Sequence, residues 1–184
     1  MRIIAGEYRG RILKNPADQR TRPTSDRLRE TLFNILTPRI DARTRFLDLC
    51  AGTGAIGIEA ISRGANFATF VDKSQRACAL IEENLDLLAV PEEQTAIIRT
   101  PAEKFVTREY PKAWDIIFYD PPYQQDYRSF LLEFAANASS LLTPEGILIA
   151  EHHFKTNLPD AIGEVRRWRI TKQGETQLSF YQVK

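Results

Sequence analysis

The sequence predicts an α/β fold whose sheet is mostly parallel and covered by helices on both faces. Between residues 45 and 151, short apolar runs alternate with segments of helical periodicity, a pattern typical of parallel strands joined by helices. The length of 184 residues suits one such domain with a small appendage. The last two apolar runs flank residues 172–175, which predicts a C-terminal antiparallel hairpin.

The beginning of the chain predicts a small extension made of a hairpin and a helix. Two short apolar runs around residues 6–9 indicate a β-hairpin within residues 2–13. Thr24 or Ser25 can cap a following helix, which Pro38 ends. The apolar face of this helix is formed by Leu28, Leu32, Ile35 and Leu36. Off that face we expect Arg27, Arg29 and Glu30.

The elements after residue 45 follow from the same patterns. A glycine, Gly64, ends the first helix, and residues 144–146 predict a turn before the fifth strand. Strands are expected at residues 46–49, 67–71, 95–99, 116–119 and 147–151, and in the hairpin at residues 165–171 and 176–183. Helices are expected at residues 55–63, 74–88 and 126–142.

The charges are divided unevenly along a chain whose net charge is only +1. Residues 1–45 contain eleven Lys or Arg against five Asp or Glu, a net of +6, and the rest of the chain carries a net of −5. Ten of the eleven cations are Arg, which binds phosphate through two parallel hydrogen bonds and stacks on bases. This region therefore predicts contacts with nucleic acid, although a solvated basic surface has the same composition.

The apolar pattern and the cysteines indicate a cytoplasmic protein. No run of about 18 apolar residues is present, so we expect no membrane span. The amino terminus lacks the apolar stretch of a signal peptide. Cys50 and Cys78 are the only cysteines, and we expect them to be reduced thiols. Neither has a nearby Cys or His, so no metal site is expected.

A glycine-rich turn follows the first predicted strand. Gly52, Gly54 and Gly57 match the pattern G-x-G-x-x-G between a strand and a helix, where backbone N–H groups approach a ligand closely. Asp72 ends the next strand and can bind two ribose hydroxyls. These features suit NAD as well as S-adenosylmethionine. Asp48, just before the turn, favours the second because a carboxylate attracts the ammonium of a methionine moiety and repels a pyrophosphate.

The tetrapeptide Asp120-Pro121-Pro122-Tyr123 ends the fourth predicted strand. The lone pair of an exocyclic base amine is delocalised into the ring, so this nitrogen is a poor nucleophile. A carboxylate and a backbone carbonyl can accept its two hydrogens, and an aromatic ring can stack on the base. Two prolines form a stiff corner that presents these groups. A plain turn closing the strand is the alternative, but a nicotinamide enzyme has no use for such a corner.

Taken together, these motifs resemble the RsmD-type methyltransferases, which modify the N2 amine of a guanine in bacterial 16S ribosomal RNA. The resemblance covers nearly the whole chain, and RPT joined to SRGA is its most particular part. The matching segments are RIIAG (2–6), RGR (9–11), RPT (22–24), DRLRETLFN (26–34), DLCAGTG (48–54), EAISRGA (59–65), DPPY (120–123) and GET (174–176).

The resemblance implies a basic extension at residues 1–40 and a Rossmann-like class I methyltransferase domain at residues 41–184. S-adenosylmethionine would contact Asp48, Ala51, Gly52, Gly54, Asp72, Lys73, Ala102 and Thr24. The target amine would be held by Asp120 and the Pro121 carbonyl, with Tyr123 stacked on the base. The substrate RNA would contact Arg9, Arg11, Arg22 and Arg27. Ribosomal RNA is the expected partner, naked or in an assembling small subunit, and the protein is expected to be a monomer.

Two segments are less clearly assigned. Pro101 stands where this family usually has an acid near the adenine amine, so adenine contacts are expected to shift to Ala102 or Glu103. The segment at residues 166–169 is interpreted either as an RNA-contacting edge or as a solvated strand face.

Three other functions remain open. An N6-adenine methyltransferase acting on DNA or RNA would share the Asp-Pro-Pro-Tyr corner. An NAD-dependent oxidoreductase would share the glycine turn. A non-catalytic RNA-binding module would retain the basic extension.

Overall fold

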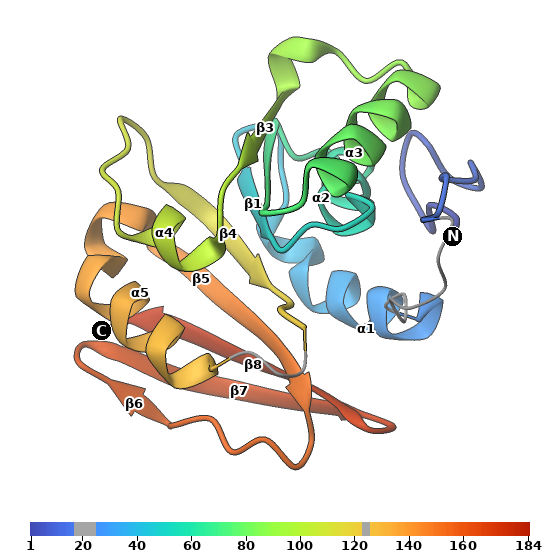
Figure 1. Ribbon diagram of the computed structural model, residues 1–184. Coiled ribbons are helices and arrows are strands. Elements are labelled where there is room, and N and C mark those ends of the chain that lie inside the picture. Colours follow the sequence, from blue (N-terminus) through green and yellow to red (C-terminus); the bar gives the residue numbers. More distant parts are fainter. Residues whose placement is uncertain (17–24, 123–125) are drawn as a thin grey trace.

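The computed structural model describes residues 1–16, 25–122 and 126–184 (Figure 1). Within these residues, eight strands form one sheet in the order β3-β2-β1-β4-β5-β8-β7-β6. β1 to β5 are parallel, and β8, β7 and β6 extend the β5 edge in antiparallel fashion. The strands are β1 (Arg45–Leu49), β2 (Phe67–Asp72), β3 (Thr95–Arg99), β4 (Trp114–Tyr119), β5 (Leu142–His153), β6 (Ala161–Ile162), β7 (Val165–Gln173) and β8 (Thr176–Val183).

Some of the helices begin at polar caps that the sequence supplies. Ser25 and Ser74 each accept a hydrogen bond from a backbone N–H three residues later, at 3.2 and 3.3 Å. Such caps satisfy N–H groups that a helix leaves unpaired at its start. The helices are α1 (Asp26–Leu36), α2 (Ala55–Ser62), α3 (Gln75–Leu88), α4 (Ala102–Val106) and α5 (Tyr127–Leu141), with short 3₁₀ turns η1 (Thr37–Arg39) and η2 (Glu92–Gln94).

Helices lie on both faces of the sheet (Figure 1), and the sheet separates two hydrophobic cores. On one face, α1, α2, α3 and the amino-terminal segment pack around Phe46, Phe70 and Phe118. On the other face, α4 and α5 pack around Leu47, Tyr119 and other alternate residues of the same strands. Strands buried on both faces explain the nearly continuous apolar runs of β1, β2 and β4.

The order of the strands reverses between β1 and β4. These two strands are neighbours, although β2 and β3 lie between them in the chain. At such a reversal, the loops at the carboxyl ends of the strands diverge, and open α/β sheets bind their ligands there. Asp48 in β1, Asp72 at the end of β2 and Asp120 just after β4 all lie at this edge.

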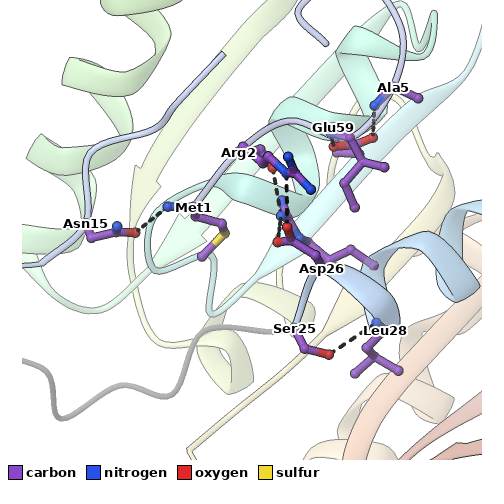
Figure 2. Close-up of polar contacts among 10 residues, drawn as sticks. Met1, Arg2, Ala5, Asn15, Ser25, Asp26, Leu28 and Glu59 are labelled. Atoms are coloured by element: carbon purple, nitrogen blue, oxygen red, sulfur yellow. Dashed lines mark hydrogen bonds and ion pairs between the residues drawn. The ribbon is translucent and has the colours of Figure 1, made fainter. Parts of the chain in front are cut away.

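The amino-terminal segment is held on α2 by buried side chains. The Glu59 carboxylate accepts hydrogen bonds from the backbone N–H groups of Ile4 (2.8 Å) and Ala5 (3.0 Å) (Figure 2). The Ser62 hydroxyl accepts from the Tyr8 N–H at 3.0 Å. Gly6 has φ of 83°, and a Cβ there would lie 1.7 Å from the Ser62 carbonyl oxygen, so only glycine permits this approach.

Most predicted elements are confirmed, and the differences have physical reasons. The predicted turn at residues 144–146 is wrong, because β5 begins at Leu142 and crosses this segment with an irregular register against β4. The helix α4 and the two-residue strand β6 were not predicted, since each is too short to show a period. The amino-terminal hairpin contains one antiparallel bridge, Arg2 to Ile12.

Arg29, which was expected off the apolar face of α1, is nevertheless buried. Its side chain is fully buried, and Nη2 donates to the Arg2 carbonyl and to the Asp26 carboxylate, both at 2.7 Å. Arg2 also pairs with Asp26 at 3.3 Å, and Figure 2 shows this pair beside the start of α1. The amino-terminal segment covers this side of the helix, which helical periodicity alone does not reveal.

Candidate functional site

The turn between β1 and α2 has left-handed backbone at three positions. Cys50, Gly52 and Gly54 have φ of 62°, 56° and 77°. The Ala51 N–H donates to the Val71 carbonyl of β2 at 3.0 Å, which fixes the turn to the neighbouring strand. Gly54 is the N-cap residue of α2. The predicted glycine turn is therefore present between a strand and a helix, where the start of the helix favours negative or polar ligand groups.

Asp48 is buried beside the turn and hydrogen-bonds to α2. Its side chain is 2% exposed, and it accepts a hydrogen bond from the Gly57 N–H of α2 at 3.0 Å. A Cβ at Gly57 would lie 2.3 Å from the Phe70 ring, so this glycine allows α2 to lie close to β2. Burial raises the pKa of Asp48 to about 8, the Gly57 hydrogen bond opposes the shift, and the charges of Asp120 and Asp72 add to it.

Asp72 connects the end of β2 to the glycine turn. Its two carboxylate oxygens accept hydrogen bonds from the N–H of Gly52 (3.0 Å) and of Ser74 (2.8 Å). The Asp72 carbonyl accepts from the Thr100 N–H at 3.0 Å, which brings the start of α4 to the same edge. An acid in this position can offer its oxygens to vicinal hydroxyls of a ribose, as the sequence predicts.

Asp120 stands at the end of β4, beside the glycine turn. Its N–H donates to the Leu49 carbonyl of β1 at 3.4 Å. Pro121 is buried and Pro122 exposed, so the corner projects from the sheet edge. Loss of hydration raises the pKa of Asp120 to about 7. This carboxylate is thus close to balance between its neutral and ionised forms near neutral pH.

Four acidic side chains lie near Cys50 at this edge of the sheet. The Cys50 thiol lies within electrostatic reach of Asp72, Asp120, Glu103 and Asp48, and burial together with these charges raises its pKa. A thiol with a raised pKa is a weak nucleophile, so Cys50 is a packing residue here. The carboxylates create a negative potential at the carboxyl edge of β1, β2 and β4, which attracts cationic ligands.

One residue of this site was missed by the sequence interpretation. Asn84 of α3 is fully buried, and its amide donates to the carbonyls of Thr53 (3.0 Å) and Lys14 (3.2 Å) and accepts from the Lys14 N–H (2.7 Å). It thereby joins the amino-terminal segment to the glycine turn. A polar residue on the buried face of a predicted helix was the available signal.

The other predicted site residues differ in their exposure to solvent. Ala51 is half-buried in the turn, Lys73 is exposed after Asp72, and Ala102 is buried at the start of α4. Arg9, Arg11 and Arg27 are exposed, and Arg11 donates to the Leu87 carbonyl of α3 at 3.0 Å. Thr24, Arg22 and Tyr123 lie outside the described residues.

The part of the chain that the structure describes lacks the groupings that would hold a metal ion or span a membrane. It contains no group of three or more His, Cys, Asp or Glu placed to hold a metal ion. None of its helices combines the length and the apolar character that crossing a bilayer requires.

A sheet of this order, with a glycine turn after β1 and an acid at the end of β2, defines a Rossmann-like methyltransferase fold. A family model described as "Conserved hypothetical protein 95" matches residues 1–182. The chain belongs to this family, the RsmD family.

Relatives and solved structures agree with this assignment. The chain is 34% identical to ribosomal RNA small subunit methyltransferase D of Escherichia coli K12 over 186 residues, covering 99% of this chain and 89% of the relative. The enzyme of the same name from Haemophilus influenzae is 30% identical over 184 residues, covering 100% and 92%. A solved Escherichia coli structure superposes with a TM-score of 0.86 at 30% identity, covering 100% of this chain and 98% of that chain. For a Thermus thermophilus structure, the TM-score is 0.81 at 31% identity, with 98% of both chains covered.

Proposed function

We propose that this protein transfers a methyl group from S-adenosylmethionine to the exocyclic N2 amine of a guanine in small-subunit ribosomal RNA. The observation that carries the proposal is the gathering of Asp48, Asp72 and Asp120 around the glycine turn, at the carboxyl edge of three adjacent strands. The family membership and the names of the relatives support ribosomal RNA as the substrate.

The residues present fit S-adenosylmethionine. The negative potential from Asp48 and its neighbours suits the positive charges of the methionine end. The oxygens of Asp72 lie at the turn, where they can accept hydrogen bonds from the ribose hydroxyls. Ala51, Gly52 and Gly54 present backbone to the ligand, and Lys73, Ala102 and Thr24 complete the proposed contacts. When bound, the cofactor supplies an electrophilic methyl group on a cationic sulfur.

The Asp-Pro-Pro corner is proposed to hold the target amine. Asp120 and the Pro121 carbonyl accept its two hydrogens and direct the nitrogen lone pair toward the cofactor side of the site. Catalysis then depends mainly on orientation and electrostatics. Because its pKa is raised to about 7, Asp120 can also take up the proton that the amine releases. Tyr123 is proposed to stack on the base once the base has left its helix.

The basic extension is proposed to bind the RNA. We assign residues 1–40 to this extension and residues 41–184 to the methyltransferase domain. The exposed Arg9, Arg11 and Arg27, together with Arg22, would neutralise phosphates. The substrate is proposed to be ribosomal RNA, naked or in an assembling small subunit, and the protein is proposed to act as a monomer.

Transfer of labelled methyl groups tests this proposal. The wild-type protein and Asp120→Ala are incubated with S-adenosylmethionine labelled in the methyl group, using small ribosomal subunits, protein-free 16S RNA and duplex DNA as separate substrates. The proposal predicts label on the N2 of one guanine in ribosomal RNA and none with Asp120→Ala. Label on N6 of adenine would instead support the adenine methyltransferase, and no transfer to any nucleic acid would contradict the proposal.

A further inference from the structure

The strand β7 carries basic and aromatic side chains on the face that α1 shares. Trp168 is 39% exposed, although tryptophan is usually buried. Its ring packs against Phe180 of β8 at a centroid distance of 5.6 Å, and the Arg39 guanidinium lies over it at 5.7 Å. Phe180 belongs to the core beneath α1, which places Trp168 on that face of the sheet.

Two further arginines lie on the same face. Arg169 pairs with Phe180 across the strands, and Arg166 pairs with Gln182, two residues further along β8. Neighbouring residues two apart in a strand point to the same side. An irregularity between Arg167 and Arg169 turns Trp168 outward beside them. We call Arg39, Arg166, Trp168 and Arg169 the β7 strip.

The β7 strip has a net positive charge. Among the described residues, no ion pair involves Arg39, Arg166 or Arg169. Acidic side chains are nearby at Glu145, whose carbonyl accepts from Arg39 at 3.1 Å, and at Asp160, which pairs with Arg167. Asp160 is therefore already engaged. Arg39 lies over the exposed indole. On the same face, Arg166 donates to the Val165 carbonyl at 3.1 Å and Arg169 Nε donates to Thr171 Oγ1 at 3.3 Å.

The turn that follows β7 lies at the same edge of the sheet as the candidate site. His153 at the end of β5 pairs with Thr176, so the β7–β8 turn lies at the same edge as Asp120. The Gln173 amide and the Thr31 hydroxyl of α1 hydrogen-bond at 2.8 Å, joining the turn to α1. From this turn, β7 leads back along the α1 face to Arg169, Trp168 and Arg166, which lie progressively further from the edge that holds Asp120.

We propose that the β7 strip binds single-stranded RNA that flanks the target base, with one base stacked on Trp168 and phosphates paired with the arginines. This inference rests on the proposed function. An exposed aromatic among arginines is the combination that binds single-stranded nucleic acid. Charged residues also protect an edge strand from pairing with another chain, but that role does not require an exposed tryptophan.

The two tryptophans allow a direct test. Trp114 is buried and Trp168 is exposed, so Trp114→Phe leaves Trp168 as the only tryptophan emitter. Protein-free 16S RNA is titrated into this variant, and emission and its quenching by acrylamide are recorded. Stacking predicts loss of Trp168 emission and protection from acrylamide. In Trp168→Phe, which keeps the buried Trp114, the change in emission should be absent.

Affinity provides the second measurement. Trp168→Ala should weaken RNA binding about 5- to 150-fold, the range expected for loss of one stacked base. The matched control is Ile170→Ala, which removes an exposed apolar side chain of the same strand. Ile170 pairs with Ser179 on the opposite face, so its loss should leave RNA affinity unchanged.

The outcomes separate this inference from the proposed function. If the wild-type protein methylates ribosomal RNA but Trp168→Ala binds RNA as tightly as the wild type does, the inference about the β7 strip is wrong. The proposed function would still stand. If Trp168 emission is quenched by RNA and no methyl transfer occurs, the strip is supported and the proposed function fails. A change in oligomeric state without a change in RNA affinity in Trp168→Ala would show that the strip contacts a second copy, and would overturn the inference.

Discussion

The cofactor half and the target half of the site differ in the hydrogen bonds that fix their carboxylates. The cofactor half is fixed by its own hydrogen bonds, since Asp48 accepts from Gly57 and Asp72 accepts from Gly52. In the target half, the described residues give the Asp120 carboxylate no hydrogen-bond partner, and only its backbone is tied to β1. The difference indicates a cofactor half that hydrogen bonds hold in place, beside a carboxylate that we propose to hold the target amine.

This comparison predicts separate effects on binding and on rate. Changes in the cofactor half should alter affinity for the cofactor. Changes in the target half should alter the rate of transfer, because a group that contacts only the reacting amine contributes mainly in the transition state. Replacing the exposed arginines of the basic extension should alter RNA binding alone.

The largest effect is expected for Asp120→Ala. Losing one group that orients the reacting amine should lower kcat about 10²- to 10³-fold. Affinity for S-adenosylhomocysteine, measured by calorimetry, should remain within about twofold of wild type because Asp72 and the glycine turn are intact. A variant with near wild-type turnover would remove Asp120 from the catalytic residues.

A smaller effect, on affinity, is expected for Asp72→Ala. Loss of hydrogen bonds to a charged acceptor costs about 1.5–3 kcal/mol, or roughly ten- to a hundredfold in Kd. Asp72→Asn is the matched control, because it keeps one oxygen that can accept from Gly52 and should bind more tightly than the alanine variant. Unchanged calorimetric affinity in both variants would contradict the proposed ribose contact.

Replacing Arg9 and Arg11 by Ala should weaken RNA binding, because each arginine is proposed to neutralise a phosphate. The log–log slope of affinity against salt concentration should decrease by about one unit for each phosphate that is no longer neutralised. Arg43→Ala serves as a control, because this arginine pairs with Asp41. If the slope is the same in the double variant and in the wild type, the charge of the extension is only a solvated surface.

The smallest expected effect is a dependence of cofactor affinity on pH. The pKa of Asp48 is raised to about 8 and that of Asp120 to about 7, so both are largely protonated at pH 6 in the free protein. A cationic ligand held against Asp48 favours its ionised form, and affinity for S-adenosylmethionine should therefore increase about three- to tenfold from pH 6 to 7.5. The window ends there because an α-amino group loses its own proton near pH 7.7–8.0.

The control for the pH dependence of cofactor affinity is Asp48→Asn, in which the increase should become smaller.

The raised pKa values of Asp48 and Asp120 also affect the stability of the free protein. Because their folded pKa values lie above the ordinary value, Asp48 and Asp120 should each make the free protein less stable as pH rises from about 4 to about 8, whereas the lowered pKa of His152 acts in the opposite direction. Across this window Asp48→Asn should therefore lose less stability in thermal unfolding than the wild type; an equal loss in both would contradict the raised pKa of Asp48.

The sequence predicted the parts of the site whose partners lie close along the chain. Gly52, Gly54 and Asp48 fall within one strand–turn–helix unit, and Asp72 ends the next strand. Asn84, by contrast, bonds to Lys14, 70 residues away, and Glu59 bonds to Ile4, 55 residues away. No local period encodes such pairs. The burial of Arg29 was missed for the same reason, because the segment that covers it begins the chain.

The most direct test measures cofactor affinity and single-turnover transfer in the same preparations of wild type, Asp72→Ala and Asp120→Ala. With small ribosomal subunits as substrate, we expect Asp120→Ala to bind cofactor normally and to lose transfer. We expect Asp72→Ala to bind cofactor weakly and to recover most of its transfer rate at saturating cofactor. If both variants lose affinity equally, or if both keep the wild-type rate, the division of the site into a cofactor half and a target half is wrong.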